Sequence, residues 1–332
     1  VYFLGMEGEF LEADVHTLAV TPISDLCDEL DLEGKAHFKD AYTGNGRVVV
    51  ANNSYYNEDF LRGESDGRLA EWDGNRWKIR KRTQINTVTG RDSDRLGRAI
   101  FAAGQDRAST LLEVYLPETG WRTYRLPKGT HTQDHAWTTE WPRIREVESE
   151  RWLVDAGGIF YEMAAMTYDD AVWGLVPVCR HLRIIGDYCS WNGMLVLAGD
   201  QATPIFDSNP FVGQPQANLW FGKTDDLWHF GGKPAGWGGP WWESRVTAGE
   251  PSDPFLMNGF DQKCLHIRHD SPDPVTFRIE LDIQGNGAWC PYRECTTEGG
   301  YAVHVFPPGL SAQWVRLDAS NDCTATAQFY YT

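Results

Sequence analysis

The sequence predicts an all-β protein, a seven-bladed β-propeller of four-stranded antiparallel blades. Helical periodicity is nearly absent, and the clearest segments are short apolar runs bounded by Gly, Asn, Asp and Pro, as in strands joined by turns. Several runs share one design and recur roughly every 40 to 55 residues, which is the period of propeller blades. The chain is also rich in aromatic side chains (13%) and in Gly (33 of 332 residues), which suit pleated sheets and tight turns.

The runs that recur at this spacing begin with a small or charged residue, continue with apolar residues and end with small residues. They occupy residues 46–53, 98–104, 151–158 and 193–200. We expect their apolar parts to be the inner strands around a common axis. Further inner strands are expected near residues 11–21, 218–223 and 255–260, which brings the count to about seven. The last strands, 302–306 and 312–317, would complete a blade begun elsewhere, and closing the ring removes free sheet edges.

A second repeat consists of a strand, a turn and a second strand that opens with Trp. Its copies carry Trp77, Trp121 and Trp289. Each copy is typical of a β-hairpin. We expect the hairpins to form the outer strands of blades, where a Trp covers the gap between twisted neighbouring sheets.

The chain shows no linker, low-complexity tract or block of charge, so we expect a single domain over residues 1–332. The alternative architecture is two β-sandwiches. Its boundary would fall near residues 240–254, between Pro240 and Pro254.

The formal net charge is −17 at pH 7. Such a surface repels nucleic acid and anionic lipid, which argues against both as partners. No stretch approaches 18 consecutive apolar residues, so we expect no membrane insertion. An acidic sugar can still bind where local Arg side chains outweigh the distant negative field. The oligomeric state is left open.

Seven cysteines form an odd set without a C-x-x-C motif, which argues against zinc and thioredoxin-like sites. Buried free thiols are the favoured interpretation. Disulfides Cys290–Cys295 or Cys179–Cys189 are the alternative. The chain begins at Val1 without an initiator Met or a signal peptide. Because a signal can be removed during maturation, the compartment stays open, with a secreted or periplasmic location slightly favoured.

The densest polar segment is residues 125–146, expected to be a long loop between two blades. It holds His131, His135, Arg143 and Arg145 beside Trp137. A His can act as a general base near neutral pH, an Arg fork can grip a carboxylate, and a Trp face suits a sugar ring. The alternative is a solvated loop whose charges pair with each other. No third ligand accompanies the two His, so we expect no metal there.

A second candidate is the Gly- and Trp-rich segment 220–242, in which Lys223 and Asp225 would bind sugar. Its alternative is structural, with Trp side chains filling the space between blades. Asp225 and Asp226 are adjacent, and adjacent strand residues point to opposite faces, so they are not expected to act as a pair.

The third candidate lies at the exit of the first inner strand. Asn52, Asn53 and Tyr55 offer amide and phenol groups for sugar hydroxyls, and the alternative is an Asn-rich turn. Familiar catalytic signatures, such as G-x-S-x-G, H-E-x-x-H and the P-loop, do not occur in the sequence.

Several sequence segments, taken together, resemble a group of uncharacterised bacterial seven-bladed β-propeller proteins. They span residues 46–53, 141–148, 221–228, 236–242 and 310–316, and the resemblance covers nearly the whole chain. That group is distantly similar in architecture to the propeller families of L-rhamnose-α-1,4-D-glucuronate lyases and related rhamnosidases. The resemblance implies a site in the axial funnel and a structural calcium ion on the propeller axis.

These features favour a carbohydrate-active enzyme that cleaves a uronate-containing glycan by β-elimination. The reaction needs a cation for the carboxylate, a base for the C5 proton and an acid for the leaving oxygen; the candidates are Arg143 or Arg145, His131 or His135, and Tyr55 or Tyr161. One alternative is a rhamnosidase-like glycoside hydrolase, which would use two carboxylates about 5 to 10 Å apart. Another is a glycan- or protein-binding propeller without chemistry.

Overall fold

The computed structural model is almost entirely β-structure. It describes residues 1–33, 36–54, 67–95, 97–130, 142–148, 151–163, 172, 174–181, 184–200, 218–298 and 300–332. The helices within these ranges are single turns, α1 (Leu26–Glu29), the 3₁₀ turn η2 (Thr224–Asp226) and α2 (Leu227–Phe230). No described helix has the length and apolar character needed to cross a membrane.

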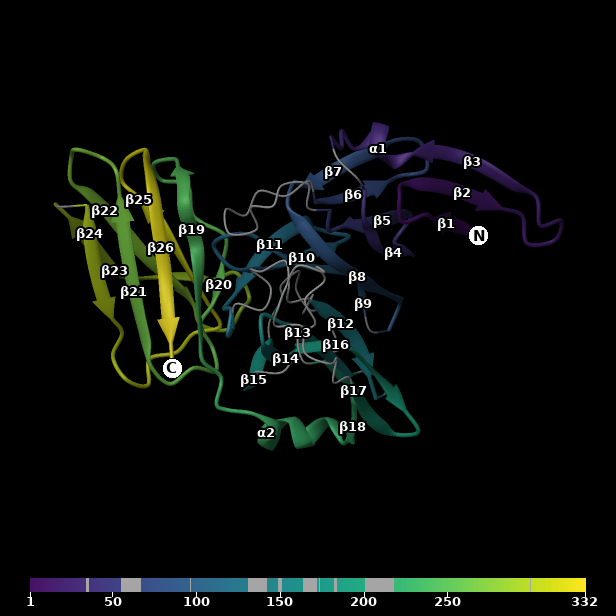
Figure 1. Ribbon diagram of the computed structural model, residues 1–332. Coiled ribbons are helices and arrows are strands. Elements are labelled where there is room, and N and C mark those ends of the chain that lie inside the picture. Colours follow the sequence, from purple (N-terminus) through teal and green to yellow (C-terminus); the bar gives the residue numbers. More distant parts are fainter. Residues whose placement is uncertain are drawn as a thin grey trace, which may run out of the picture.

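The first two thirds of the chain form five antiparallel sheets that follow one another in chain order, and we call them blades 1 to 5 (Figure 1). Blade 1 contains β1 (Tyr2–Leu4), β2 (Glu9–Ala13) and β3 (Val20–Asp25). Blade 2 contains β4 (Phe38–Gly44), β5 (Arg47–Asn52), β6 (Arg68–Trp72) and β7 (Trp77–Lys81). Blade 3 contains β8 (Gln84–Ser93), β9 (Gly97–Gln105), β10 (Thr110–Leu116) and β11 (Gly120–Leu126).

The last two blades have the same up-and-down order. Blade 4 contains β12 (Arg143–Val147), β13 (Arg151–Ala156), β14 (Ile159–Met163) and β15 (Val176–Arg180). Blade 5 contains β16 (Ile184–Trp191), β17 (Met194–Asp200) and β18 (Asn218–Gly222). The five blades lie in an arc that runs in Figure 1 from the upper right, through the centre, to the lower right.

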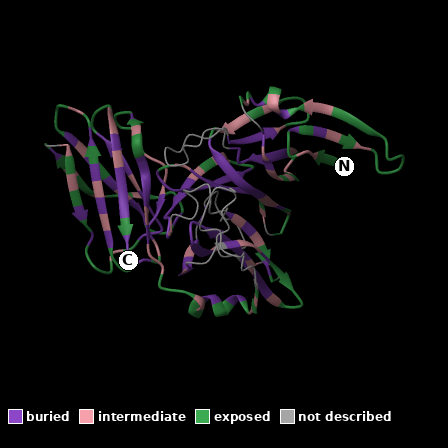
Figure 2. Ribbon diagram, viewed as in Figure 1, coloured by how far each residue is buried: buried purple, intermediate pink, exposed green. Residues whose placement is uncertain are grey.

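The innermost strands of blades 2 to 5 are their first strands. β4 contacts β8, β8 contacts β12, and β12 contacts β16. The four runs predicted as inner strands are instead the second strands β5, β9, β13 and β17, one position farther out. The prediction was wrong by one strand because a second strand is covered on both faces and reads as a continuous apolar run. Figure 2 shows this burial along β5, β9 and β13.

Residues 236–332 form a two-layered sandwich, at the left of Figure 1. One layer has the order β19 (Gly236–Val246), β26 (Cys323–Tyr331), β21 (Lys263–His269) and β24 (Tyr301–Val305). The other has the order β23 (Trp289–Thr297), β22 (Val275–Asp282), β25 (Trp314–Ala319) and β20 (Phe255–Leu256). This second layer joins blade 3 through a parallel pair between β11 and β20, at Arg125 and Phe255.

The predicted count of seven blades is not confirmed, because the described residues form five. Two of the seven expected inner strands have other places. The segment 218–223 is β18, which shares blade 5 with β17, so one blade was counted twice. The segment 255–260 contributes the two-residue strand β20 to the sandwich, and the final strands 302–306 and 312–317 lie in the sandwich as β24 and β25.

One hydrophobic cluster runs without interruption from blades 3 and 4 into the sandwich. It includes Phe101 of β9, Tyr161 of β14 and Trp314 of β25. The Trp314 Nε1 donates a hydrogen bond to the Val172 carbonyl oxygen at 2.9 Å, which ties the sandwich to blade 4. The sandwich therefore shares its core with the blades, and the single domain over 1–332 stays a prediction.

The three Trp hairpins form as expected, but only two of them belong to blades. Trp77 and Trp121 lie in the last strands of blades 2 and 3, opposite Trp72 and Tyr115 respectively. Trp289 opens β23 at the edge of the sandwich, so the prediction that it sits on a blade was wrong. A hairpin pattern specifies local pairing and leaves open which sheet the hairpin joins.

All seven cysteines are free thiols, as the favoured interpretation expects, although only Cys179 is fully buried. Burial raises the pKa of Cys179 to about 12. This thiol therefore stays protonated at neutral pH, which keeps it unreactive.

Candidate functional site

Buried polar side chains gather at one end of the blades, which we call the strand-start end. Antiparallel pairing places the start of each first strand beside the end of the second, as in Phe38 with Asn52, Gln84 with Gln105, and Arg143 with Asp155. Because the first strands contact one another, these starts lie together around the middle of the arc. The buried polar residues at this end are Asn52, Asn53, Gln84, Asn86, Gln105, Asp155 and His181.

The segment before β4 brings an imidazole to this end. The Asn52 Oδ1 accepts hydrogen bonds from the backbone N–H of His37 at 3.2 Å and of Ser54 at 2.7 Å. The backbone N–H of Asn53 donates to the His37 carbonyl oxygen at 3.2 Å. Both Asn residues are fully buried. These predicted substrate-binding residues therefore position the His37 segment through hydrogen bonds.

The His37 imidazole is biased toward its neutral form. Burial lowers its pKa below the ordinary 6.5, the charge on Lys39 lowers it further, and the Asn53 side chain offsets part of the shift. In a neutral imidazole one ring nitrogen is unprotonated, and a general base accepts its proton there. His37 therefore has the properties expected of His131 or His135.

Two cations from different blades, Lys39 and Arg143, lie close enough for the charge of Arg143 to act on Lys39. Burial lowers the pKa of Lys39, which precedes Asp40 on β4, and the Arg143 guanidinium lowers it further. Burial also lowers the pKa of Arg143, on β12, whose side chain is 14% exposed. Two like charges that are close together and partly removed from water raise each other's free energy, and an anion placed between them relieves that cost.

Two carboxylates, Asp187 and Asp40, act on Arg143. The Asp187 Oδ2, on β16, is 3.8 Å from the Arg143 Nε and 3.2 Å from the Arg145 Nη2. Asp40 also acts on Arg143, although its Oδ2 accepts hydrogen bonds from the Thr87 hydroxyl at 2.9 Å and the Val88 N–H at 3.1 Å. The structure thus brings together the predicted Arg143 and Arg145, and it makes Arg145 chiefly the ionic partner of Asp187.

A buried acid–imidazole pair lies next to this cluster. The Asp155 Oδ1, at the end of β13, is 3.0 Å from the His181 Nε2, and both side chains are almost completely enclosed. Sequence reasoning missed this pair. The signal was available, because Asp155 ends a buried apolar run, and a carboxylate in that place needs a partner.

Four predicted site residues lie outside the described residues: Tyr55, His131, His135 and Trp137. The two described ends of segment 125–146 belong to different strands, 125–126 to β11 and 143–146 to β12. Arg125 is buried at the end of β11, where it pairs with Asp106 at 2.8 Å and with Asp253 at 2.9 Å. This start of the predicted loop therefore ties blade 3 to the sandwich.

Tyr161 lies in the hydrophobic core. It is fully buried, and its hydroxyl donates to the Pro127 carbonyl oxygen at 2.9 Å. Burial raises the pKa of Tyr161 far above its ordinary value. An enclosed phenol whose proton is already engaged cannot reach a leaving oxygen, so we leave Tyr161 out of the proposed site.

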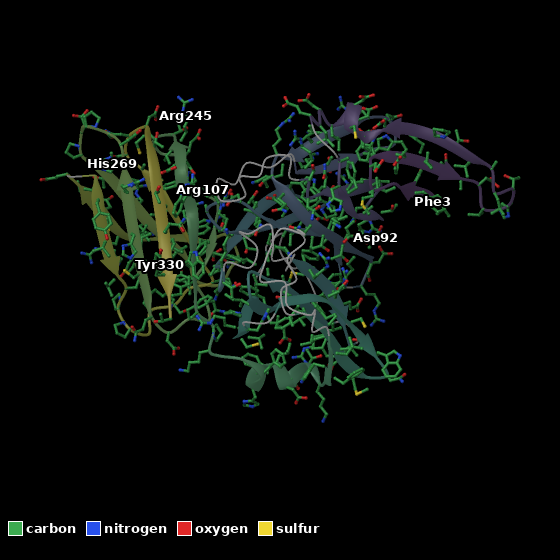
Figure 3. All side chains as sticks on the ribbon, viewed as in Figure 1. Phe3, Asp92, Arg107, Arg245, His269 and Tyr330 are labelled. Carbon is green, nitrogen blue, oxygen red and sulfur yellow. The ribbon has the colours of Figure 1, made fainter. Side chains whose placement is uncertain are left out.

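Lys223 and Asp225 lie at the opposite end of the blades. The Asp225 Oδ1 is 2.8 Å from the Arg151 Nη2, and Arg151 starts β13 opposite Val147, the last residue of β12. Lys223 caps the 3₁₀ turn η2, where its N–H donates to the Asp226 Oδ2 at 2.8 Å. Asp92, labelled in Figure 3, is the next-to-last residue of β8 and likewise lies away from the start of its strand. The length of the strands therefore separates these residues from His37 and Arg143.

A calcium site on the propeller axis is not evident in the part of the chain that the structure describes. Calcium takes six to eight oxygen ligands, several of them carboxylates. Within the described residues, no group of three Asp, Glu, His or Cys side chains converges to hold a metal. The described side chains thus do not supply the set that this ion requires, and the axial calcium stays a prediction.

Comparisons with known proteins leave the family open. No protein-family model and no curated protein matches the chain. Solved structures that align include a Bacteroides ovatus xyloglucan-locus GH43B (10% identity, 100% of this chain, 94% of that chain, TM-score 0.28). Others are the GH43 BlXynB protein from Bacillus licheniformis (9%, 99% and 94%, TM-score 0.32) and the Trypanosoma rangeli sialidase (11%, 97% and 74%, TM-score 0.27). TM-scores this low establish neither a common fold nor an activity.

Proposed function

We propose that the strand-start end binds the carboxylate of a uronate-containing glycan and cleaves the glycan by β-elimination. What supports this proposal is that Lys39 and Arg143 are partly desolvated cations, and that the charge of Arg143 lowers the pKa of Lys39, which is two residues from the neutral-biased His37. Sequence reasoning placed the cation and the base on segment 125–146 and the acid on Tyr55 or Tyr161, and Arg143 is the residue common to both sets.

The electrostatics favour an anionic ligand at this place. In a chain of net charge −17, Lys39, Arg143 and Arg145 concentrate cations at this end, and the carboxylates of Asp40 and Asp187 offset part of their charge. Arg143 offers a planar fork that matches a carboxylate, and Lys39 adds a point charge with three donors. A uronate carboxylate between them would relieve their mutual repulsion, so the gain in binding free energy includes the relief of a cost present in the free protein.

The chemistry follows from the same three residues. Lys39 and Arg143 neutralise the carboxylate, which makes the proton on the adjacent C5 more acidic. His37 takes that proton, the C5–H electrons form the C4–C5 double bond, and the bond between C4 and the glycosidic oxygen breaks. The leaving oxygen takes a proton from an acid, for which Tyr55 remains the predicted residue. One proton is gained by the base and one is lost by the acid, so the step balances.

A glycoside hydrolase is the second candidate, and the carboxylates around Arg143 favour it. Asp40 and Asp187 come from blades 2 and 5 and both act on the same guanidinium. A pair of carboxylates flanking a glycosidic bond is the usual machinery of hydrolysis. In this alternative, one carboxyl protonates the leaving oxygen, and the other activates water or attacks the sugar.

The products of one reaction separate these possibilities. We expect a glucuronate-linked oligosaccharide to yield an unsaturated uronate, detected by its ultraviolet absorbance and by mass spectrometry. His37→Ala should lower the rate by about 10²- to 10⁴-fold. His16→Ala, which removes an exposed imidazole from blade 1, is the matched control and should leave the rate unchanged.

Two results would overturn the elimination. Products that together have gained the elements of one water molecule for each bond cleaved, without ultraviolet absorbance, would establish hydrolysis. Glucuronate binding without any product would establish the binding propeller. A full rate in His37→Ala would remove His37 from the mechanism, whichever product forms.

A further inference from the structure

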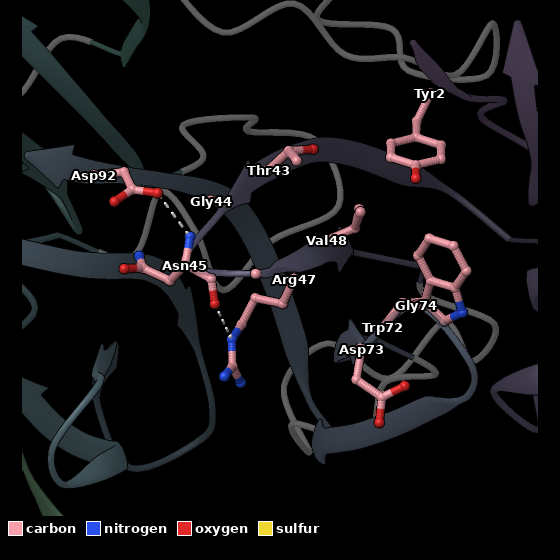
Figure 4. A pocket seen from close by; sticks show the side chains of 11 residues that line it. Tyr2, Thr43, Gly44, Asn45, Arg47, Val48, Trp72, Asp73, Gly74 and Asp92 are labelled. Carbon is pink, nitrogen blue, oxygen red and sulfur yellow. Dashed lines mark hydrogen bonds between the residues drawn. The ribbon is translucent and has the colours of Figure 1, made fainter.

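A pocket lies at the far end of blade 2, away from the proposed site. Its volume is about 210 Å³. It opens between the β4–β5 hairpin, the β6–β7 turn and the N-terminal strand β1 (Figure 4). The side chains around it are Tyr2, Thr43, Arg47, Trp72, Asp73 and Asp92. Ligand pockets for drug-sized molecules measure roughly 300–1,000 Å³, so this one is sized for a single ring.

The pocket and the strand-start end are separate. β4 runs from Phe38 at the strand-start end to Gly44 at the pocket. Six residue steps at about 3.3 Å each span roughly 20 Å. A sugar held by Lys39 and Arg143 therefore cannot occupy this pocket as well.

Two aromatic rings wall the pocket and are held in place from behind. Tyr2 and Trp72 meet edge to face, with centroids 5.6 Å apart and ring planes at 85°. Phe10 packs against both, at 5.4 Å from Tyr2 and 5.5 Å from Trp72, and Trp77 stacks on Trp72 at 6.2 Å. Rings fixed in this way lose little conformational entropy when a ligand binds, which favours recognition of an apolar ring face.

Two of the charged groups around the pocket, Arg47 and Asp92, are already matched. Arg47 donates to the Glu71 carboxylate at 2.7 Å and to the Tyr115 hydroxyl at 2.7 Å. Asp92 accepts the Asn45 N–H at 3.0 Å and pairs with the Arg98 Nε at 3.0 Å. A charged ligand would therefore have to displace these contacts or lie beside a like charge.

The remaining polar groups suit hydroxyls. Figure 4 shows the hydroxyls of Tyr2 and Thr43 on one side of the pocket and the Asp73 carboxylate on another. Hydroxyl groups both donate and accept, and a carboxylate accepts. From the ring walls, the matched charges and these polar groups, we propose that the pocket binds one neutral sugar ring. The ring stacks its C–H face on Trp72 or Tyr2 and directs its hydroxyls to Thr43 and Asp73.

The test uses neutral methyl glycosides of glucose, galactose and xylose, with saturation-transfer NMR and titration calorimetry on the whole chain. We expect at least one to bind with a dissociation constant in the millimolar range. Tyr2→Ala should weaken it about five- to ten-fold, and Tyr2→Phe should retain most of the affinity because it keeps the ring. Tyr301→Ala removes a comparably exposed ring from β24 and should change nothing.

Three outcomes would overturn the pocket assignment. The first is that none of the three glycosides binds. The second is that a glycoside binds and Tyr2→Ala leaves its affinity unchanged. The third is that no glycoside binds but tetramethylammonium does, and Tyr2→Ala abolishes that binding, which would make the pocket a cation site. Lys39→Met should leave the neutral glycoside unaffected, so failure of the uronate proposal and failure of this one give different results.

Discussion

Glu71 ties blade 2 to blade 3, and its removal should cost stability in a way that the structure allows us to estimate. One carboxylate oxygen accepts hydrogen bonds from the Arg47 Nη1 and the Trp121 Nε1, each at 2.7 Å, and the other accepts from Arg80. The Glu71 side chain is 8% exposed, whereas Arg47 and Arg80 are 21% and 25% exposed. Breaking a fully buried ion pair costs about 3–5 kcal/mol. Water can reach both guanidinium groups, so we expect about 2–3 kcal/mol for Glu71→Gln.

The assay is urea unfolding at pH 7 and again at lower pH. Burial acts to raise the pKa of Glu71, but hydrogen bonds from Arg80, Trp121 and Arg47 together lower it below the ordinary 4.5. Its stabilising contribution is therefore present above pH 4.5 and is lost as the pH falls through the lower, folded-state pKa. The difference in unfolding free energy between Glu71→Gln and the parent protein should disappear over that pH range.

The matched control is Glu280→Gln in the sandwich. Glu280 accepts one hydrogen bond, from the Arg316 Nε at 2.7 Å, and its loss should cost about 1 kcal/mol. A cost for Glu71→Gln no larger than that of Glu280→Gln would refute the tie between blades. If the difference in unfolding free energy persists unchanged well below pH 4.5, the stabilisation by Glu71 does not have an electrostatic origin.

Further predictions concern the site and the core. Turnover should keep its full rate below pH 6.5 before it falls, because the neutral form of His37 persists to a pH under its ordinary pKa; a rate that already halves above pH 6.5 would exclude His37 as the base. Tyr161→Phe should cost about 1–3 kcal/mol in unfolding free energy, since the buried Pro127 carbonyl loses its donor, and it should leave glucuronate affinity intact in calorimetry. Lys39→Met should not lower the melting temperature in scanning calorimetry, because the folded state disfavours the charged form of Lys39.

The sequence predicts strands best where both faces of a strand are covered. β5, β9, β13 and β17 were located because their middles are apolar without a break. The first strands are more polar, as in Phe38-Lys39-Asp40 of β4 and Gln84-Ile85-Asn86 of β8, because they face the middle of the arc. Strands of mixed polarity resemble loops in a single sequence, and this is why the second strands were mistaken for the innermost ones.

The sandwich shows that a local sequence pattern does not predict which strands pair across the chain. The segment around Trp289 has the same strand, turn and Trp as the blade hairpins, yet β22 pairs with β25 instead of with a blade strand. That choice depends on contacts between residues far apart in the chain, which a hairpin pattern does not encode. The alternative boundary at 240–254 falls inside and just after β19, close to the point where the sandwich begins.

The candidate site likewise contains residues that the sequence predicted and residues that only the folded structure reveals. Arg143 was found because charges are dense around it in the sequence. His37 and Lys39 lie about a hundred residues earlier in an ordinary-looking segment, and only the contacts of β4 with β8 and of β8 with β12 bring them near Arg143. Lys223 and Asp225 were expected beside the same ligand, but strand direction puts them at the other end.

The central claim is that Lys39 and Arg143 recognise a carboxylate, and calorimetric titration with glucuronate and with glucose tests it most directly. The parent protein should bind glucuronate in preference to glucose, and added salt should reduce that preference. Lys39→Met should weaken glucuronate binding about ten-fold and leave glucose unchanged, whereas Lys223→Met, at the opposite end of the blades, should alter neither. Equal affinity of the parent protein for the two sugars, or a loss in Lys223→Met that matches the loss in Lys39→Met, would contradict the account.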